Sequence, residues 1–313
     1  MIDSPPLTGL VAATFTPFDD EGAIRFEIIP EYVEFLVRNG VEGIYICGST
    51  GEGPSLTIGE RKSVAEAFVT AARGRMRTIV HVGHTSLAEV CELAHHAETS
   101  GADAISSVSP YYFKPESTEA LVHFFQVAAE AAPTLPFYYY HIPALTGVSV
   151  SPVHFLEKGA KAIPTLRGIK FTDTDLSLMN ACQEVGRGQF DVLFGRDEML
   201  LSGLCAGAKG AVGSTYNLAP QLYRKVIEFC QEGDLESARK WQLQSVAMIQ
   251  AIVGVGGEAA IKYPMRLHGL DCGPRRLPMR QLSPEEKAEL DRRLEALGFH
   301  EWAISGNAVE ASA

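Results

Sequence analysis

The residue whose position most clearly suggests catalytic chemistry is Lys170. It lies in a short apolar run, where burying a charged lysine costs free energy. Residues 167–172 read Arg-Gly-Ile-Lys-Phe-Thr, a short β-type run that ends in a polar stretch. Side chains alternate along a strand, so Gly168, Lys170 and Thr172 share one face and the apolar residues between them share the other. An ammonium group on the inner face of a buried strand loses its hydration and relieves this cost by releasing its proton. The neutral amine forms a Schiff base with a ketone, whereas a strand-end lysine can also extend into water.

Eight short runs of apolar, β-branched or aromatic residues recur along the chain, separated by longer stretches with helical periodicity. The short runs are Leu10–Phe15, Gly43–Ile46, Thr78–Val82, Ala104–Val108, Pro136–Tyr140, Gly168–Phe171, Asp191–Phe194 and Gly210–Gly213. The helical stretches are Phe26–Arg38, Thr57–Arg73, Leu87–Ser100, Thr118–Ala131, Ser151–Ala162, Leu176–Val185, Glu198–Ala206 and Ala219–Gln231. This alternation predicts a (β/α)8 TIM barrel. A doubly wound sheet fits less well, because no GxGxxG sequence follows the first strand.

Three further helical stretches after the eighth unit predict a C-terminal helical appendage. They are Asp234–Val253, Ala259–Leu267 and Ser283–Leu297. We therefore expect a barrel at residues 1–232 and C-terminal helices at 233–305 that pack on it as part of the same domain unit. The small polar tail at 306–313 should fray.

Composition limits the classes of protein to which the chain can belong. Its 313 residues are 46% hydrophobic and 21% charged, which is typical of a globular protein with a sizeable core. The formal net charge of -11 and the lack of basic runs argue against nucleic acid and membranes as partners, but leave room for an anionic metabolite. The six scattered cysteines, the lack of a secretory signal and the lack of a membrane-spanning stretch predict a cytoplasmic protein.

A barrel of this class carries its chemistry at the carboxyl ends of its strands. That rule selects Ser49–Glu52, Tyr111–Tyr112, Tyr140, Lys170 with Thr172, Gly195–Glu198 and Ser214–Thr215. These segments are far apart in the sequence but converge on one rim of the predicted barrel. The convergence favours the Schiff-base interpretation of Lys170 over the solvent-exposed one.

Metal binding is the less favoured interpretation of the histidines. His81 and His84 are close in sequence, as are His95 and His96, but no set of carboxylate or thiolate ligands joins them. Neither an HExxH sequence, a zinc ribbon nor a P-loop is present. We expect no metal and no cofactor other than a covalent imine between the lysine and a keto acid.

Three motifs resemble the pyruvate-dependent class I aldolases of the N-acetylneuraminate lyase and dihydrodipicolinate synthase superfamily. They are Gly48-Ser49-Thr50-Gly51-Glu52, the segment Tyr140–Gly147 and Gly168-Ile169-Lys170. The resemblance runs from about Leu10 through the appended helices, and residues 194–198 and 213–217 are similar to the N-acetylneuraminate lyase branch. The dihydrodipicolinate synthase branch carries an arginine for a second carboxylate near the position of Leu145, and no arginine lies near it in this sequence.

The resemblance implies a role for each residue of the predicted rim. Lys170 would condense with the C2 ketone of open-chain N-acetylneuraminate, and the protonated imine would accept electrons as the C3–C4 bond breaks. Tyr140 would take the proton from the C4 hydroxyl, assisted by a hydroxyl relay through Ser49. A phenol needs such help, since its ordinary pKa is about 10. Without the resemblance, Tyr140 could equally be an aromatic residue that fills the barrel, which is our interpretation of Tyr138 and Tyr139.

The remaining residues would bind the substrate. Ser49 and Thr50 would hold its carboxylate, and Thr172 would donate a hydrogen bond near the imine. The resemblance assigns the hydroxyl tail of the sugar to Gly195, Asp197, Glu198 and Ser214. A local turn, β-propensity and helix capping would explain these residue types equally well without a substrate.

Three further residues have two interpretations each. Tyr112 matches a position that reaches the site of a neighbouring subunit, which implies a homo-oligomer, a tetramer by resemblance, although it could be a simple loop aromatic. Arg196 could adjust specificity for the tail or point to solvent. His141 could tune the surroundings of Tyr140 or be purely structural.

The favoured function is therefore retro-aldol cleavage of N-acetylneuraminate to N-acetylmannosamine and pyruvate. One alternative is another pyruvate-dependent aldolase or a dehydratase that acts on a 2-keto-3-deoxy sugar acid. The other is a non-catalytic barrel that binds keto acids or sialic acids. A binding protein has no use for both Lys170 and Tyr140, which argues against the last alternative.

Overall fold

Eight parallel strands close into a barrel, as the sequence predicts. The computed structural model describes residues 5–304, and the predicted tail at 306–313 lies outside them. The strands are β1 (Gly9–Ala13), β2 (Gly43–Ile46), β3 (Arg77–His81), β4 (Ala104–Val108), β5 (Phe137–His141), β6 (Leu166–Phe171), β7 (Asp191–Phe194) and β8 (Gly210–Gly213). Each strand pairs with the next, and β8 closes the ring on β1.

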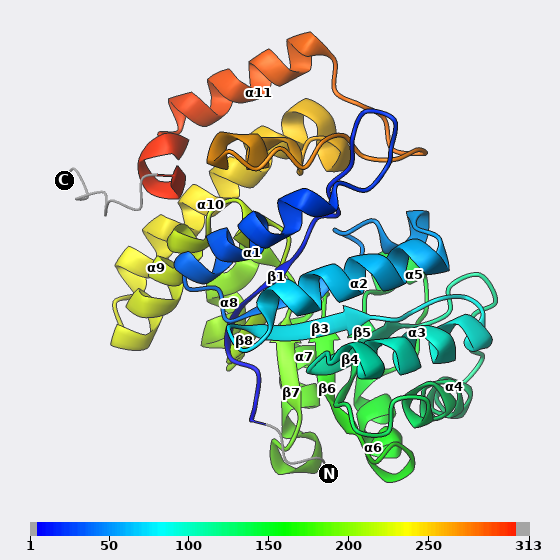
Figure 1. The fold of residues 1–313 in the computed structure, drawn as a ribbon. Helices are drawn as coiled ribbons and strands as arrows, with labels where there is room; N and C mark the ends of the chain where they lie inside the picture. The colour runs from blue at the N-terminus through cyan, green and yellow to red at the C-terminus, as the bar shows by residue number, and fades with distance from the viewer. Residues whose placement is uncertain (1–4, 305–313) are drawn as a thin grey trace.

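Helices surround this barrel in the order that the sequence predicts (Figure 1). They are α1 (Ile29–Arg38), α2 (Ile58–Ala72), α3 (Leu87–Ser100), α4 (Thr118–Glu130), α6 (Pro152–Ala162), α7 (Leu176–Glu184), α8 (Leu200–Cys205) and α9 (Pro220–Glu232). A short helix that was not predicted, α5 (Pro143–Thr146), follows β5. The (β/α)8 class is thereby confirmed.

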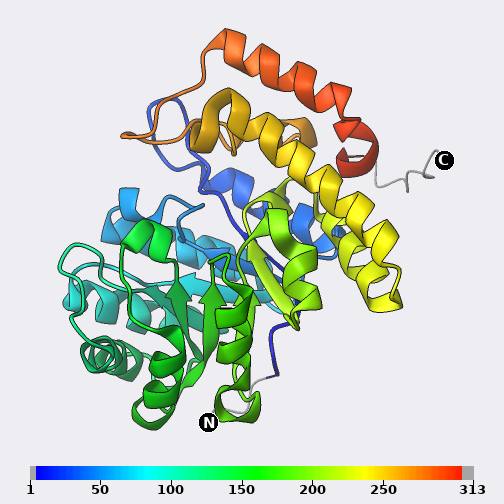
Figure 2. The same cartoon turned by 180° about the vertical axis from the view of Figure 1, so that it is seen from behind.

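The C-terminal appendage differs in detail from the prediction. Helix α10 (Leu235–Gly256) lies alongside α9, and α11 (Pro284–Ala296) packs on α10, at the top of Figure 2. The single helix expected at Ala259–Leu267 is replaced by two 3-10 segments, Gly257–Ala259 and Tyr263–His268. Gly257 leaves the helical region, with φ 56° and ψ -137°, and thus interrupts the ladder of hydrogen bonds.

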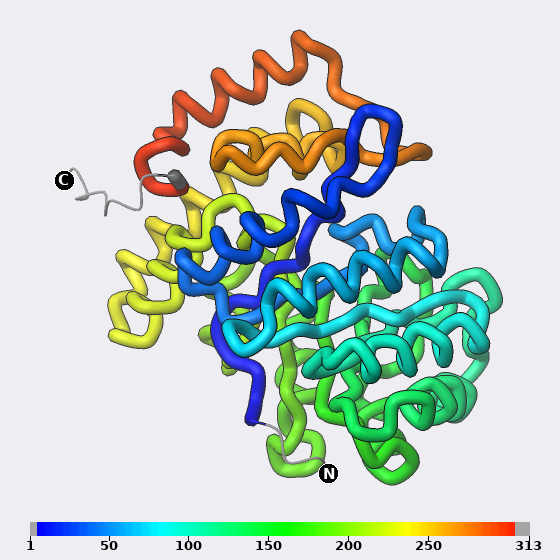
Figure 3. The backbone as a smooth tube through the Cα atoms, in the orientation of Figure 1, coloured from blue at the N-terminus to red at the C-terminus, as the bar shows by residue number. Residues whose placement is uncertain are grey.

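The appendage also reaches back to the barrel. Figure 3 shows the loop after β1 next to the chain that follows residue 270. The backbone N–H of Phe18 donates a hydrogen bond of 3.0 Å to the carbonyl oxygen of Cys272, and the Arg25 side chain donates one of 3.2 Å from Nη1 to the carbonyl oxygen of Asp271. The segment between the second 3-10 segment and α11 is therefore hydrogen-bonded to the loop that follows β1.

Two apolar clusters follow from the alternation along the strands. Outward residues pack against the helices, and inward residues fill the barrel. The inward cluster consists of Val11, Ala13, Tyr45, Ile79, Ala104, Val108, Tyr138, Tyr140, Ile142, Leu193 and Val212. Tyr139 faces outward, 4.7 Å from the ring of Phe155 between centroids, so our interpretation of Tyr139 as a barrel-filling residue was wrong. Consecutive residues of a strand cannot point to the same side.

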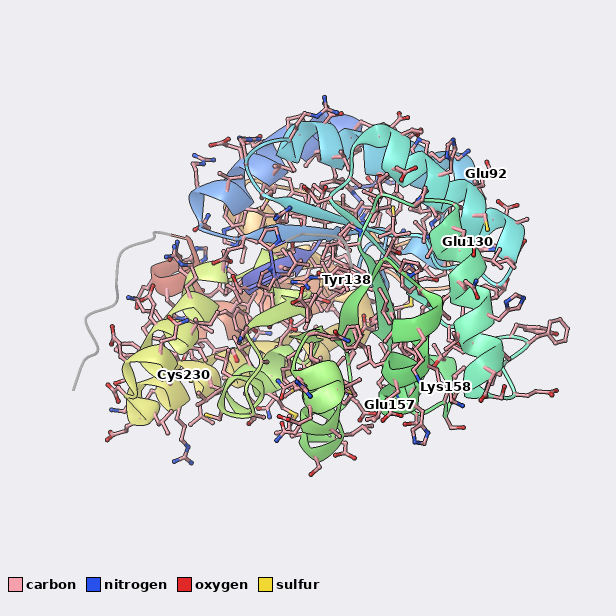
Figure 4. All side chains as sticks on the ribbon, turned by 90° about the horizontal axis from the view of Figure 1, so that it is seen from below. Glu92, Glu130, Tyr138, Glu157, Lys158 and Cys230 are labelled. Carbon is pink, nitrogen blue, oxygen red and sulfur yellow. The ribbon has the colours of Figure 1, made fainter. Side chains whose placement is uncertain are left out.

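Tyr138 occupies the centre of the barrel at the end opposite the predicted rim (Figure 4). Its hydroxyl donates a hydrogen bond of 2.8 Å to Asp191 Oδ2, at the start of β7. Arg167 Nε lies 3.4 Å from the same oxygen. This polar group closes the amino-terminal end of the barrel.

Two further features concern the length of the helices and the cysteines. No helix within residues 5–304 is long and apolar enough to cross a membrane. All six cysteines are free thiols, of which Cys47, Cys182 and Cys272 are buried and Cys205 is exposed.

Candidate active site

Lys170 lies inside the barrel and is only 5% exposed. Tyr140 is its direct neighbour in the register of β5 and β6. The Nζ atom lies 4.0 Å from the centroid of the Tyr140 ring and 4.3 Å from that of Tyr45. No other residue in the described part of the chain forms a hydrogen bond or an ion pair with Nζ. The amine is thus held by aromatic faces and has its lone pair or protons free for chemistry.

The Ser49–Thr50 turn follows β2 and has an unusual backbone. Cys47 and Glu52 at its two ends both adopt φ 58°, in the left-handed region. Gly53 donates a backbone hydrogen bond of 3.0 Å to the carbonyl oxygen of Gly48, which closes the turn. The Ser49 side chain is exposed and makes no hydrogen bond with residues 5–304. Its hydroxyl is therefore available to an incoming anion.

The turn after β2 meets the loop after β8 directly. The hydroxyl oxygens of Thr50 and Ser214 lie 2.5 Å apart, although 164 residues separate them in the sequence. Asn217 donates hydrogen bonds of 2.7 Å to the carbonyl oxygens of Ser214 and Ala13, which holds the β8 loop against β1. Two of the predicted binding residues are thus brought together.

Thr172 and Gly195 form a second close pair. The Thr172 hydroxyl is buried and has no hydrogen-bond partner among residues 5–304. A β-carbon at Gly195 would lie 2.0 Å from that oxygen, so only glycine leaves it room. An unsatisfied buried hydroxyl is costly, and a substrate atom would supply the missing partner.

Asp197 lies at the interior end of the loop after β7 and is buried. Its Oδ2 accepts hydrogen bonds from the Thr215 backbone N–H, at 2.8 Å, and from the Thr215 hydroxyl, at 2.6 Å. No side chain caps the 3-10 segment Asp197–Met199, so the interpretation of Asp197 as a cap of the helix after β7 was wrong. Its carboxylate instead bridges to the loop after β8.

Burial raises the pKa of Asp197 to about 6, from an ordinary value of 3.8. The two hydrogen bonds from Thr215 and the charge of Lys170 oppose this shift. Glu198, by contrast, is partly exposed and lies 3.4 Å from Arg196 Nη1. Arg196 is therefore turned toward Glu198 and shields one of the two predicted acceptors.

The raised pKa of Asp197 predicts a specific dependence of stability on pH. Between pH 4 and 6 the folded protein keeps a proton that the unfolded chain has released, so the free energy of unfolding falls as pH rises through this window. Asp197→Asn keeps the shape and does not titrate. In urea titrations, the free energy of unfolding of the wild type should therefore fall by about 2 kcal/mol between pH 4.5 and pH 7, relative to that of this variant.

The surface carboxylate Asp20 offers a matched control. Asp20→Asn should give unfolding free energies that run parallel to wild type between the same pH values. If Asp197→Asn also ran parallel, burial of the Asp197 charge would contribute nothing to folding.

His141 lies on the outer side of β5, away from the barrel interior. Its ring stacks on Phe171 with 5.4 Å between centroids, and its Nδ1 lies 3.4 Å from the hydroxyl of Tyr139. Burial lowers the pKa of His141 to about 4, an effect that Asp173 partly opposes. The structural interpretation of His141 is therefore favoured over a role beside Tyr140.

Tyr112 is the predicted site residue that lies outside this group. Its side chain is 77% exposed, and its ring contacts that of Phe113 at 5.0 Å between centroids. Tyr111, Tyr112 and Phe113 together form an exposed aromatic loop after β4. Tyr112 is free to contact another molecule.

A buried ion cluster behind the Ser49–Thr50 turn escaped the sequence analysis. Glu52 Oε1 lies 3.3 Å from Lys262 Nζ and 3.7 Å from Arg275 Nε. Glu52 Oε2 accepts a hydrogen bond of 2.9 Å from the backbone N–H of Arg276. Burial lowers the pKa of Lys262 to about 8, although Glu52 opposes the shift. Since 210 residues separate Glu52 from Lys262, no local pattern signals this cluster.

Removing one charge from this cluster should be strongly destabilising. Lys262→Met keeps the length of the side chain but leaves the Glu52 carboxylate buried with a weaker partner. We expect the free energy of unfolding to fall by about 3–5 kcal/mol in a urea titration. Lys161→Met, on the exposed face of α6, is the control and should change it by less than about 0.5 kcal/mol. Equal stability of the two variants would contradict a structural role for the cluster.

No metal centre is evident in the same region. Across residues 5–304, no group of three or more histidine, cysteine, aspartate or glutamate side chains lies close enough to hold a metal ion.

Comparison with known proteins places this geometry in a family. A model of the dihydrodipicolinate synthetase family matches residues 6–297. The chain is 43% identical to the N-acetylneuraminate lyase of Homo sapiens over 298 residues, which cover 94% of this chain and 93% of that protein. The structure of Proteus mirabilis N-acetylneuraminate lyase superposes with a TM-score of 0.92 at 41% identity, covering 94% of this chain and 100% of that one. The structure of N-acetylneuraminate lyase from Aliivibrio salmonicida superposes with a TM-score of 0.92 at 40% identity, covering 95% of this chain and 98% of that one. The chain belongs to the dihydrodipicolinate synthetase family.

Proposed function

We propose that this chain is an N-acetylneuraminate lyase that works through a Schiff base on Lys170. The observation that carries the proposal is the buried amine of Lys170 beside the Tyr140 ring, at the rim where barrel enzymes place their chemistry. Relatives with this name are 42–45% identical over most of the chain and support the choice of substrate.

The proposed reaction begins when Lys170 Nζ attacks the C2 carbonyl carbon of the open-chain sugar acid. The carbonyl oxygen leaves as water, and a protonated imine remains. The phenol of Tyr140 relays the proton of the C4 hydroxyl away as the C3–C4 bond breaks, and the bond electrons move into the imine. N-acetylmannosamine leaves as the aldehyde. Protonation of the enamine at C3 and hydrolysis of the imine then release pyruvate.

The proposed substrate contacts follow from the same rim. The exposed hydroxyl of Ser49, Thr50 and the backbone N–H groups of their turn would hold the carboxylate. The unpartnered hydroxyl of Thr172 would donate near the imine. The hydroxyl tail would meet Gly195, Asp197, Glu198 and Ser214, where carboxylates suit a ligand that donates many hydrogen bonds.

We also propose a homo-oligomer, a tetramer by resemblance, in which the exposed Tyr112 reaches a neighbouring subunit. Its partners would be the sugar keto acid and pyruvate rather than nucleic acid or membranes, and its compartment the cytoplasm. The barrel at 1–232 and the helices at 233–305 would form one unit, an arrangement that the Glu52–Lys262 pair supports.

Substrate choice tests the proposal against a dihydrodipicolinate synthase activity. Leu145 is 69% exposed and offers no cation for a second carboxylate. We therefore expect release of pyruvate from N-acetylneuraminate, measured with a coupled lactate dehydrogenase assay, and poor condensation of pyruvate with aspartate semialdehyde. Efficient use of aspartate semialdehyde would contradict the assignment. Faster cleavage of a simple 2-keto-3-deoxy sugar acid would favour the alternative aldolase.

A further inference from the structure

The nitrogen of Lys170 lies against two aromatic rings, and a third ring packs beside them. Tyr140 and Tyr45 present their faces to it at 4.0 and 4.3 Å, and their own centroids lie 5.8 Å apart at 74°. The His81 ring lies 5.9 Å from each of these two rings. We call the rings of Tyr45, Tyr140 and His81 the aromatic cage. Tyr45 is on β2 and Lys170 is on β6, four strands apart in the closed order, so the cage and the lysine together span the barrel. Tyr45 has no role in the proposed reaction so far.

We propose that Tyr45 is a further catalytic residue whose ring face stabilises positive charge on the Lys170 nitrogen. The inference rests on the proposed Schiff base. The nitrogen carries a positive charge as the protonated imine, the form that accepts the electrons of the breaking C3–C4 bond. An aromatic face attracts a cation at these distances, most strongly where water is excluded.

The aromatic cage stabilises the positive charge on the nitrogen without a negatively charged side chain. Nζ has no carboxylate within 4.0 Å among the residues that the structure describes. A carboxylate in the place of Tyr45 would pair with Lys170 but would also repel an incoming keto acid, which is itself an anion. Uncharged rings leave the carboxylate of the substrate as the natural counter-ion of the imine. The cage therefore suits covalent capture of an anionic ketone.

The other titratable groups around the cage keep it neutral. His81 Nε2 accepts a hydrogen bond of 3.2 Å from the Val108 backbone N–H, so its proton resides on Nδ1, 3.2 Å from the Cys47 carbonyl oxygen. Burial and the nearby Arg61 guanidinium hold the pKa of His81 well below its ordinary value. Burial likewise raises the pKa of Tyr45 well above its ordinary value. The Asp197 carboxyl is buried nearby, but it is engaged by Thr215, whose backbone N–H and hydroxyl both donate to Oδ2.

The Tyr45 ring is fixed from two sides. Its hydroxyl donates a hydrogen bond of 3.0 Å to Ser106 Oγ. A β-carbon at Gly48 would lie 2.6 Å from Tyr45 Cε1, so the glycine that opens the Ser49–Thr50 turn packs flat on the ring. The ring thus lies between the proposed carboxylate turn and the imine nitrogen.

The test removes π-electron density while keeping the shape of the ring. Tyr45→Phe is the reference, and the same position is then filled with 3,4,5-trifluorophenylalanine. Each protein is incubated with pyruvate and cyanoborohydride, which reduces the protonated imine, and the adduct is measured by mass spectrometry across pH. A weaker face lets both the amine and the imine lose their protons more easily. The pH profile of trapping should therefore move to lower pH by roughly 0.4–1.5 units, at an unchanged Tm.

Trifluorophenylalanine at Phe137 is the matched control, because this buried ring faces the helices and packs on Phe125 at 5.1 Å between centroids. It should leave the profile where it is. If the protein with trifluorophenylalanine at position 45 had the same pH profile of trapping as Tyr45→Phe, the inference would be overturned. The proposed Schiff base on Lys170 would still stand. If the wild-type protein formed no adduct at any pH, the proposed function itself would fail.

Discussion

Lys170→Ala should abolish turnover and leave the barrel folded. With pyruvate and borohydride, the wild-type protein should gain one reduced pyruvyl group on the peptide that contains Gly168-Ile169-Lys170, and the variant none. The reason is that Nζ is the only atom of this cage that can form the covalent bond to C2. Alanine is tolerated in a strand interior, and the change removes a buried amine that makes no hydrogen bond within residues 5–304. Circular dichroism and mass spectrometry provide the two measurements.

Two lysines help to interpret the result. Lys209→Ala, an exposed residue just before β8, should be labelled like wild type and serves as the control. Within residues 5–304, Lys262 is the other buried lysine, but it is engaged with Glu52 and with the carbonyl oxygen of Pro274 at 3.0 Å. An adduct on Lys262, or a fully active Lys170→Ala protein, would contradict the proposed mechanism.

Tyr140→Phe should lower kcat by about 10²–10⁴-fold, the usual contribution of a general acid–base group. The variant keeps the ring face at 4.0 Å from Nζ but lacks the hydroxyl that would handle the C4 proton. Trapping of pyruvate on Lys170 should persist, because the amine and its aromatic cage remain. Steady-state kinetics with N-acetylneuraminate and trapping with pyruvate therefore separate proton transfer from imine formation.

Tyr138→Phe is the matched control on the same strand. Its hydroxyl binds Asp191 at the opposite end of the barrel, so its loss should reduce stability slightly and leave kcat nearly unchanged. If Tyr140→Phe cleaved the substrate at close to the wild-type rate, the base would lie elsewhere. His141 is a poor replacement because it faces outward, which leaves the carboxylate of the substrate as the next candidate.

The sequence by itself determined the barrel and the side of each strand. Eight apolar runs with helical stretches between them specify a (β/α)8 fold, since local periodicity records which residues are buried. The same alternation places Lys170 on the inner face of β6, and along β5 it separates the outward Tyr139 from the inward Tyr138. Strand ends were located to within two residues.

Only the tertiary structure decided which rim residues meet. Closure of the barrel brings Thr50 to Ser214 and Asp197 to Thr215, and packing of the C-terminal segment on the barrel brings Lys262 to Glu52. Barrel closure also places Tyr45 across the barrel from Lys170. The short run Gly43–Ile46 does not by itself predict this contact. Local patterns encode burial and period, whereas the partner of a polar side chain depends on the stagger of strands and on loops from distant parts of the chain. For that reason the elements could be read along the chain, and the contacts at the site could not.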